Sequence, residues 1–423
     1  MHATRFGSTY KHRGTRAATA APAATAARDK TARQLQYDVV IAGGGVAGVA
    51  AAVAAARAGC RTALIEKTCM LGGLATAGMV TWYPQLDDGK GNQVTFGLAE
   101  ELLLASLKYG PGEVYGTWSK KGTARFVPKG KYSTHFNAAS FALALDEVIL
   151  DAGVELWFDT LVTQPIVRRN RLSGLELWNK SGKSVVTAAC FIDATGDADI
   201  AFRAGAPCVE QKDLMALFHL EASLDRVKKC WAEKNAAAFK TPRNIGYSHP
   251  GTAEPRPLPK GTLYNVVDGR ELTQFVMDGH VRLREYYRAA QAKLGAQGRK
   301  LVFPLAFATL PDVHKSRRID GQFTLTEGMN DTPFSDSIGV VSNWMKTSEI
   351  WMVPYGVLLP RGITGLLAAG RCIAADKIVW DIMRVIQACV HTGELAGVAA
   401  ALAVKRATTP DALPVAAVQQ AVA

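Results

Sequence analysis

Cysteine is scarce in this sequence. Seven cysteines occur among 423 residues, and no two of them have the Cys-x-x-Cys spacing. Few, unclustered cysteines argue against a disulfide-stapled scaffold and favour a reducing compartment. No His-Glu-x-x-His or similar spacing of metal ligands occurs either, so we expect no metal site.

Acidic residues are almost absent from the N-terminal segment. Residues 1–36 contain seven Lys or Arg but only one acid, Asp29, and carry +6 of the chain's net charge of +12. The other 387 residues have a net charge of only +6. This charge is too small to predict nucleic-acid binding. The segment also has few large apolar residues, so we expect a disordered basic tail.

Long apolar runs are also lacking. The tail has no apolar core of about 7–15 residues, so we do not expect it to be a secretory signal. Its Arg-rich composition leaves organellar targeting open beside a cytoplasmic location.

Residues 39–56 carry no charge and approach the length of a membrane-spanning helix. Three consecutive glycines interrupt them, so a strand, a turn and a helix explain them better, and we expect no membrane segment.

The same stretch carries a pattern for binding a dinucleotide. Residues 37–42 are apolar and β-branched, which predicts a buried parallel strand. An alanine-rich helix is expected at residues 49–58, and a second strand at residues 62–65 ends on Glu66. This strand–helix–strand order makes a glycine pattern informative. The pattern Gly-x-Gly-x-x-Gly lies between the first strand and the helix, as Gly43-Gly44-Gly45-Val46-Ala47-Gly48.

Each part of the pattern has a mechanical role. Gly43 permits the tight turn, Gly45 lets the backbone approach a pyrophosphate, and Gly48 lets the helix pack close to the strand. The helix N-terminus offers free N–H groups and the positive end of its dipole to the pyrophosphate. Glu66 follows Gly48 by eighteen residues, where a carboxylate accepts hydrogen bonds from ribose hydroxyls.

The next residues, 67–78, distinguish between dinucleotides. Their sequence, Lys-Thr-Cys-Met-Leu-Gly-Gly-Leu-Ala-Thr-Ala-Gly, resembles that of FAD-dependent oxidoreductases with the glutathione-reductase-like fold. In those proteins, Glu-Lys followed by Gly-Gly-x-x-Thr wraps the ribityl chain and the isoalloxazine of the flavin, and nicotinamide dehydrogenases lack this run. The resemblance implies FAD as the cofactor. It implies cofactor contacts for Lys67, Gly72, Gly73, Leu74 and Thr76.

Further elements resemble the same flavoproteins. Residues 191–197 predict a strand that ends in Ala194-Thr195-Gly196-Asp197, which the family carries near the adenosine half of the cofactor. Residues 365–371 predict a short strand that ends in Gly370-Arg371. Asp376 follows, where the family holds ribityl or pyrophosphate oxygens. A strand at residues 161–163 would pass under the adenine, with backbone hydrogen bonds from Val162.

A long helix is expected at residues 382–404. In the flavoprotein fold its N-terminal part points at the flavin pyrimidine, so its dipole stabilises negative charge on the reduced ring. The resemblance places Thr392 and Gly393 at this approach, with His391 beside them. The family more often has Gln where this chain has Glu394. A direct contact of Glu394 with the cofactor therefore stays open.

The C-terminal half is similar to one broad bacterial family of FAD-dependent oxidoreductases. The family pattern Ser-Arg-Arg-Ile-x-Gly-x-x-x-Leu-Thr corresponds to residues 316–326, and three shorter runs complete the match. The family usually has Ser where this chain has Ala374. The resemblance covers residues 37 to about 404 and implies redox chemistry, but it does not imply one substrate. The shorter runs are residues 334–339, 353–355 and 370–376.

We therefore expect an α/β protein, with a Rossmann-like FAD-binding domain and an inserted α+β substrate domain. The FAD-binding domain would combine a parallel sheet with an antiparallel meander, which the alternation and turns of residues 165–190 predict. The expected boundaries are residues 37–85, 136–210 and 361–405 for the FAD-binding domain, 86–135 and 211–360 for the substrate insertions, and 406–423 for a C-terminal tail.

A flavin dehydrogenase needs a proton acceptor beside the substrate and groups that hold the substrate over the flavin. The resemblance makes His391 the best-placed histidine, with a simple packing role as the alternative. Arg384 could bind a substrate carboxylate or the flavin edge. Arg317 could clamp an anion or form a structural ion pair, and Tyr355 would lie near the same substrate. Two further histidines are weaker candidates, His135 and His314.

No second Gly-x-Gly-x-x-Gly occurs, so we expect no separate NADPH domain. The expected function is hydride transfer between a small organic substrate and flavin N5, in a dehydrogenase or oxidase whose electron acceptor and oligomeric state are unknown. Two alternatives stay open. A flavin monooxygenase would take electrons from an external reductant, and an RNA-modifying flavoprotein would bind its target with basic residues. Neither a membrane nor a nucleic acid is the expected partner.

Overall fold

The structure is a computed structural model that describes residues 33–90, 92–112, 133–240, 242–246 and 262–423. Most of the expected disordered tail, residues 1–32, lies outside these ranges.

The first strand, β1 (Arg33–Ala42), starts earlier than expected. It pairs in parallel with β8 (Gly182–Asp193), beginning with Arg33 opposite Ser184. Assigning residues 33–36 to the tail was therefore wrong. The side chains of these residues are mostly exposed, so backbone hydrogen bonds to β8, rather than burial, extend the strand.

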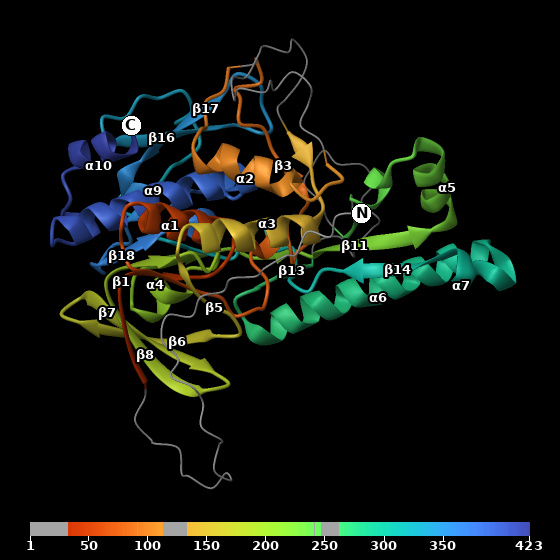
Figure 1. The fold of residues 1–423 in the computed structure, drawn as a ribbon, viewed down its shortest axis with the longest axis horizontal. Coiled ribbons are helices and arrows are strands. Elements are labelled where there is room, and N and C mark those ends of the chain that lie inside the picture. The colour runs from red at the N-terminus through yellow and green to blue at the C-terminus, as the bar shows by residue number, and fades with distance from the viewer. Residues whose placement is uncertain (1–32, 91, 113–132, 241, 247–261) are drawn as a thin grey trace, which may run out of the picture. The chain divides into compact units, whose positions relative to one another are not determined.

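A seven-stranded sheet contains both strands. Its order is β5-β2-β1-β8-β7-β6, and β18 also pairs with β8. The pairs among β5, β2, β1, β8 and β18 are parallel, whereas β6, β7 and β8 form an antiparallel meander. The predicted α/β fold with its meander is confirmed (Figure 1). The other strands are β2 (Thr62–Ile65), β5 (Glu155–Trp157), β6 (Leu161–Arg168), β7 (Arg171–Asn179) and β18 (Leu366–Ala368).

Two helices, α1 (Val46–Arg57) and α9 (Ile386–Lys405), pack on this sheet and against each other (Figure 1). A Cβ atom at Gly393 would lie 2.2 Å from the carbonyl oxygen of Ala47. Glycine is therefore required where α9 crosses α1. Two further helices, α2 (Leu98–Leu107) and α3 (Ala138–Asp151), extend this layer.

The expected helix at residues 382–404 is interrupted. Its first residues belong to α8 (Lys377–Met383), and α9 begins only after Val385, whose backbone is extended. The expected C-terminal tail also differs from the structure, because it contains α10 (Val415–Val422), which packs against α9. Val418 on α10 is fully buried, so apolar contact orders this segment.

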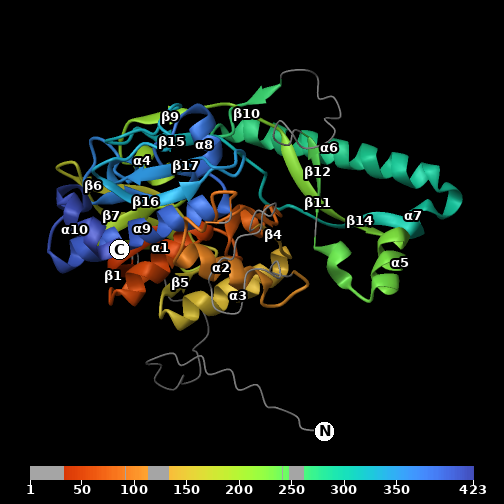
Figure 2. The ribbon, with the colours of Figure 1, turned by 90° about the horizontal axis from the view of Figure 1, so that it is seen from above.

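A second layer has its own apolar core. Here β12 (Arg243–Gly246), β11 (Ala216–Ser223) and β14 (Val302–Phe307) form an antiparallel sheet, against which α6 (Gly269–Lys293) packs. We call residues 216–240, 242–246 and 269–307 the arm, and Figure 2 displays its helices and strands. The core between the sheet and α6 includes Met215, Leu217, Phe275, Leu283 and Tyr287.

The remaining elements are short. The helices are α4 (Asp199–Arg203), α5 (Leu224–Glu233) and α7 (Gly298–Leu301). The two-stranded pairs are β3 (Trp82–Tyr83) with β4 (Thr134–His135), β9 (Cys208–Glu210) with β15 (Arg317–Ile319), β10 (Asp213–Leu214) with β13 (Leu263–Tyr264), and β16 (Ser337–Ser342) with β17 (Ile350–Pro354).

Within the described ranges, α9 alone is long and apolar enough to cross a membrane. Its most apolar window is 78% buried inside the fold, which is typical of the core helix of a globular protein. We interpret α9 as a core helix.

The close contact between α1 and α9 can be tested by adding one methyl group. We expect Gly393→Ala to lower the free energy of unfolding by about 1–3 kcal/mol, because overpacking a core forces its elements apart. Gly269→Ala is the matched control, since a Cβ atom there meets nothing within 4 Å. Urea unfolding measures both variants, and equal stabilities would contradict the close approach.

Candidate functional site

A cavity of about 580 Å³ opens at the carboxyl ends of β1, β2 and β8. In open α/β sheets, ligands bind at this edge, where neighbouring strands lead away in opposite directions. Most of the predicted cofactor-binding residues line this cavity. They are Gly43, Gly45, Val46, Ala47, Glu66, Lys67, Gly72, Gly73, Leu74, Val162, Ala194, Thr195, Gly196, Asp197 and Arg371.

The three glycines of the Gly-x-Gly-x-x-Gly loop are needed for two different reasons. Gly43 has a φ of +103°, and a Cβ atom there would lie 2.4 Å from the carbonyl oxygen of Ala194. A Cβ atom at Gly48 would lie 1.8 Å from the carbonyl oxygen of Gly43. At Gly45, by contrast, a Cβ atom would meet nothing within 4 Å. Gly43 and Gly48 are needed by the fold itself, whereas Gly45 leaves open space for a ligand.

Glu66 lies beneath this loop and is only 6% exposed. Its carboxylate accepts hydrogen bonds from the N–H groups of Gly44 (2.6 Å) and Thr68 (2.7 Å). Each of its oxygens can accept another bond. The acid is therefore fixed at the cavity wall and still able to bind hydroxyl groups.

The loop after β2 forms the next part of the wall. Gly72 has a φ of +100°, and a Cβ atom at Gly73 would lie 3.0 Å from the Cα atom of Gly45. The hydroxyl of Thr76 donates to the carbonyl oxygen of Leu71. Thr76 does not line the cavity, so its place in this structure is within the turn that presents the two glycines.

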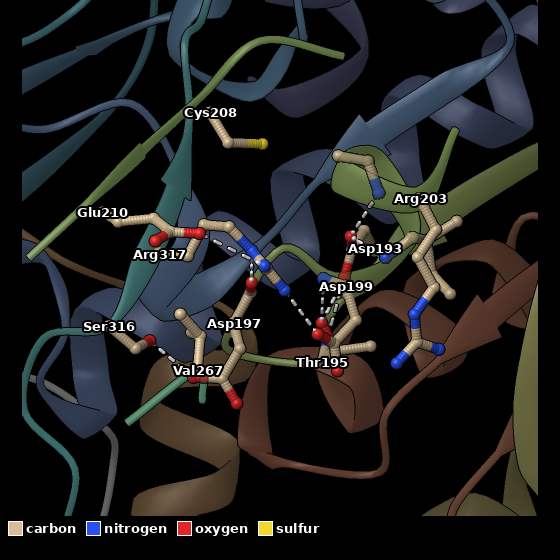
Figure 3. A network of polar contacts seen from close by, with 12 residues as sticks. Asp193, Thr195, Asp197, Asp199, Arg203, Cys208, Glu210, Val267, Ser316 and Arg317 are labelled. Atoms are coloured by element: carbon tan, nitrogen blue, oxygen red, sulfur yellow. Dashed lines mark hydrogen bonds and ion pairs between the residues drawn. The ribbon is translucent and has the colours of Figure 1, made fainter. Parts of the chain in front are cut away.

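Paired charges organise the wall at the end of β8, as Figure 3 shows. Arg371 Nη2 lies 2.8 Å from Asp197 Oδ1, and Arg317 Nη2 lies 2.7 Å from Asp199 Oδ1. Arg317 also donates from Nε to the carbonyl oxygen of Asp197 (2.9 Å) and lies over the ring of Phe202. Arg317 is not a lining residue. It forms the structural ion pair that the sequence had left open.

A pair of titratable residues faces the cavity from the segment before β15. His314 Nε2 lies 3.2 Å from Asp312 Oδ2, and both residues line the cavity. The carboxylate of Asp213 accepts the backbone N–H groups of His314 (2.5 Å) and Lys315 (3.1 Å). These bonds fix the backbone that carries the imidazole.

The environment keeps Asp312 ionised. Its side chain is almost fully buried, and burial by itself raises the pKa of a carboxyl group. The charge and hydrogen bond of His314, together with the charges of Arg384 and Arg371, outweigh burial and hold the pKa of Asp312 below its ordinary value. An ionised Asp312 can accept a hydrogen bond from Nε2 of His314 and so orient the imidazole.

Arg384 lines the cavity, as expected, but at the break between α8 and α9. Its Nε atom donates to Asp381 Oδ1 at 2.9 Å, and Lys315 Nζ lies 2.7 Å from the other oxygen of Asp381. Burial raises the pKa of Asp381, but the neighbouring Arg384 and Lys315 outweigh this and lower it overall. Arg384 is therefore held in place by an ionised carboxylate.

His391 does not line the cavity. The lining residues of this helix region are Arg384, Val385, Ile386 and Cys389. His391 follows Cys389 by two residues, about 200° further round α9, and so lies on the opposite face of the helix. The ring of His391 faces β16 instead, where a Cβ atom at Gly339 would lie 2.3 Å from Nε2. Neither ring nitrogen has a hydrogen-bond partner in the described parts of the chain, and burial lowers the pKa of His391 to about 4.

The other predicted residues outside the cavity have structural contacts. The buried hydroxyl of Tyr355 donates to the carbonyl oxygen of Pro410 (2.9 Å). Asp376 caps α8 by accepting the N–H of Lys377. The hydroxyl of Thr392 accepts the N–H of Gly370 (3.1 Å). These residues stabilise the fold around the cavity and do not line it. The same is true of Gly48 and Gly393.

Sequence reasoning missed the apolar walls of the cavity. Trp82 and Trp344 meet edge to face with their ring centroids 5.4 Å apart, and both line the cavity. The arm contributes Phe218 and Leu272. Neither wall carries a motif. Phe218, Leu272 and Trp344 come from the stretch 211–360 that we expected to be an insertion, whereas Trp82 lies within the expected FAD-binding range 37–85. The segment before β15 had one signal, His314, which lies two residues before the matched run 316–326.

Glu394 lies away from the cavity. It accepts the N–H of Leu98 at the start of α2 (3.0 Å), so it caps that helix and does not contact the cofactor region. Burial raises the pKa of Glu394 to about 7 from an ordinary 4.5. Between these two pH values the folded chain keeps a proton that the unfolded chain releases, so stability falls as pH rises.

Replacing the carboxyl group of Glu394 by an amide tests how much its buried negative charge lowers the stability of the fold. We expect Glu394→Gln to match the native stability at pH 4, and to exceed it at pH 8 by on the order of 1–3 kcal/mol. The amide oxygen can still accept the N–H of Leu98. Urea unfolding at the two pH values gives the comparison. A stability difference that does not change with pH would show that burial leaves this carboxyl unperturbed.

Several solved structures resemble this chain at low sequence identity. A geranylgeranyl bacteriochlorophyll reductase-like protein from Thermoplasma acidophilum is 14% identical, with a TM-score of 0.46 over 92% of this chain and 82% of that one. The p-nitrophenol 4-monooxygenase of Pseudomonas putida is 12% identical, with a TM-score of 0.47 over 92% and 84%. A myxobacterial chondrochloren halogenase is 13% identical, with a TM-score of 0.46 over 92% and 78%. These likenesses carry no argument about the reaction.

No curated protein matches the sequence. One family model does, and it spans nearly all of the described fold. The family is described as FAD dependent oxidoreductase, and the match covers residues 38–422. This chain therefore belongs to the FAD-dependent oxidoreductase family, and its cofactor is FAD.

Proposed function

We propose that this oxidoreductase is a dehydrogenase that removes a hydride and a proton from a small organic substrate. The observation that supports the proposal is the Asp312–His314 pair at the cavity wall. A dehydrogenase needs a proton acceptor beside the bond that is oxidised, and this pair supplies one.

The residues around the cavity fit FAD. The N-terminus of α1 has no side-chain cap, so its N–H groups remain to bind a pyrophosphate. Gly45 leaves open space above them. Glu66 would accept hydrogen bonds from the ribose, and the backbone of Val162 would contact the adenine. When bound there, FAD supplies a two-electron acceptor for a hydride.

His314 would act as the proton acceptor. With Nε2 directed at Asp312, Nδ1 is the ring nitrogen left to take a proton from a substrate hydroxyl or amino group. The oxidation breaks that O–H or N–H bond and the adjacent C–H bond, and it forms a C=O or C=N bond. Asp312 is a positioning residue whose charge stabilises the imidazolium. Arg384 would bind an anionic group of the substrate.

The apolar walls support the same proposal. Trp82, Trp344 and Phe218 make part of the cavity wall apolar. Exclusion of water strengthens each polar contact to the reacting group. It also favours substrates whose non-reacting part is apolar.

Gly45→Val tests the FAD site separately from the reaction. The branched side chain would fill space that is open in the structure, so the chain should fold normally but lose FAD. Titration of the flavin-free variant with FAD measures the loss, which we expect to exceed 100-fold in Kd. Gly45→Ala should give a smaller loss. Native FAD affinity in both variants would place the pyrophosphate elsewhere.

His314→Asn tests the proton acceptor. An anaerobic screen of secondary alcohols, 2-hydroxy acids and amines for bleaching of the flavin first identifies a substrate. We then expect His314→Asn to slow flavin reduction by about 10²–10⁴-fold, the usual contribution of general base catalysis. Asp312→Asn should show a smaller loss.

His391→Ala is the control, because His391 lies outside the cavity, and its rate per bound FAD should stay native. An unchanged rate in His314→Asn would contradict the assignment. Reduction by NADH or NADPH, with none by the substrate panel, would favour the monooxygenase instead.

A further inference from the structure

Helix α5, at the end of the arm, exposes its apolar side chains. Leu224, Val227 and Trp231 have the i, i+3, i+7 spacing that places them on one face of the helix. They are 45%, 50% and 86% exposed, and α5 buries none of its residues. An amphipathic helix usually buries such a face. Among the residues that the structure describes, none buries this face of α5.

More apolar side chains are exposed at the same end. Leu294 follows α6, and Phe303 and Leu305 lie on β14. These three are 48%, 44% and 51% exposed. Ser223 pairs with Val302, so α5 and β14 begin side by side. Figure 2 shows α5, α7 and β14 at one end of the arm. We call residues 224–234 and 293–305 the arm end.

The arm end is also strongly basic. It contains seven Lys or Arg and two acids, which gives it a net charge of +5. An exposed tryptophan among aliphatic side chains and lysines is typical of helices that lie in the interfacial region of a membrane. The basic residues are Arg226, Lys228, Lys229, Lys234, Lys293, Arg299 and Lys300, and the acids are Asp225 and Glu233.

We propose that the arm end binds the surface of a membrane that contains anionic phospholipids. The apolar side chains would enter the boundary between headgroups and acyl chains, and the lysines and arginines would contact the phosphates. Charge distinguishes this occupant from a second copy of the chain. Two arm ends of +5 would repel each other, whereas an anionic surface attracts one. The proposal goes beyond the proposed function and does not depend on it.

Vesicle binding by the full-length, FAD-loaded protein tests the proposal. One set of vesicles contains phosphatidylcholine alone, and in the other set phosphatidylglycerol replaces one third of the lipid. We expect binding to the anionic set that weakens at high salt. Trp231→Ala should reduce this binding by about tenfold, because an interfacial aromatic anchor is lost. The double substitution Lys228→Glu with Lys229→Glu should reduce it by more than tenfold.

Matched controls separate the arm end from other surfaces. Trp178→Ala removes a tryptophan that is 57% exposed on β7, and Arg168→Glu with Arg406→Glu reverses two exposed charges outside the arm. The tryptophan control should bind like the native protein, and the charge control should lose much less than the arm-end pair. These comparisons are needed because residues 1–36 carry a charge of +6. Flavin absorbance per chain reports whether each variant is folded.

Three outcomes would overturn the proposal. The first is a native protein that does not bind anionic vesicles. The second is equal binding by the native protein and the arm-end variants, which would assign the binding to other basic residues. The third is a dimer in sedimentation that Trp231→Ala dissociates while vesicle binding is unchanged, which would make the arm end an interface between two copies.

Discussion

The structure depends on how closely the backbone after β1 approaches the end of β8. Gly43 lies so close to the backbone of Ala194, and Gly48 so close to that of Gly43, that neither position has room for a Cβ atom. This contact fixes where α1 starts, and α1 in turn packs against α9 through Gly393. The beginning of α9 borders the cavity. A single backbone constraint therefore sets the position of the glycine loop and of the start of α9, both of which border the cavity.

Ion pairs hold the polar walls of the cavity in place. Asp197 and Asp199 are oriented by Arg371 and Arg317, while Asp381 holds Arg384. Each arginine is matched by a carboxylate, so few charges are buried without compensation. The Asp312–His314 pair differs, because the partner of its carboxylate is an imidazole, whose second ring nitrogen can accept a proton. This difference is why we assign it to the reaction.

Local patterns predicted the sheet well. The strand, turn and helix around Gly45 and the meander after Val162 follow from short-range periodicity and turn residues, and both are present. The sequence placed His391 beside the substrate or in a packing role, and in the structure it lies outside the cavity, on the face of α9 opposite Cys389. The break at Val385, between two helices that look continuous in sequence, was not predicted. The pairing of His314 with Asp312, and the meeting of Trp82 with Trp344, depend on tertiary contacts that no local pattern encodes.

The central claim is that this cavity holds FAD along the glycine loop. The most direct measurement is the visible absorption spectrum of the purified protein, followed by acid release and identification of the flavin. The account predicts a yellow protein that releases FAD, close to one molecule per chain. A colourless protein that cannot be reconstituted with FAD would contradict it.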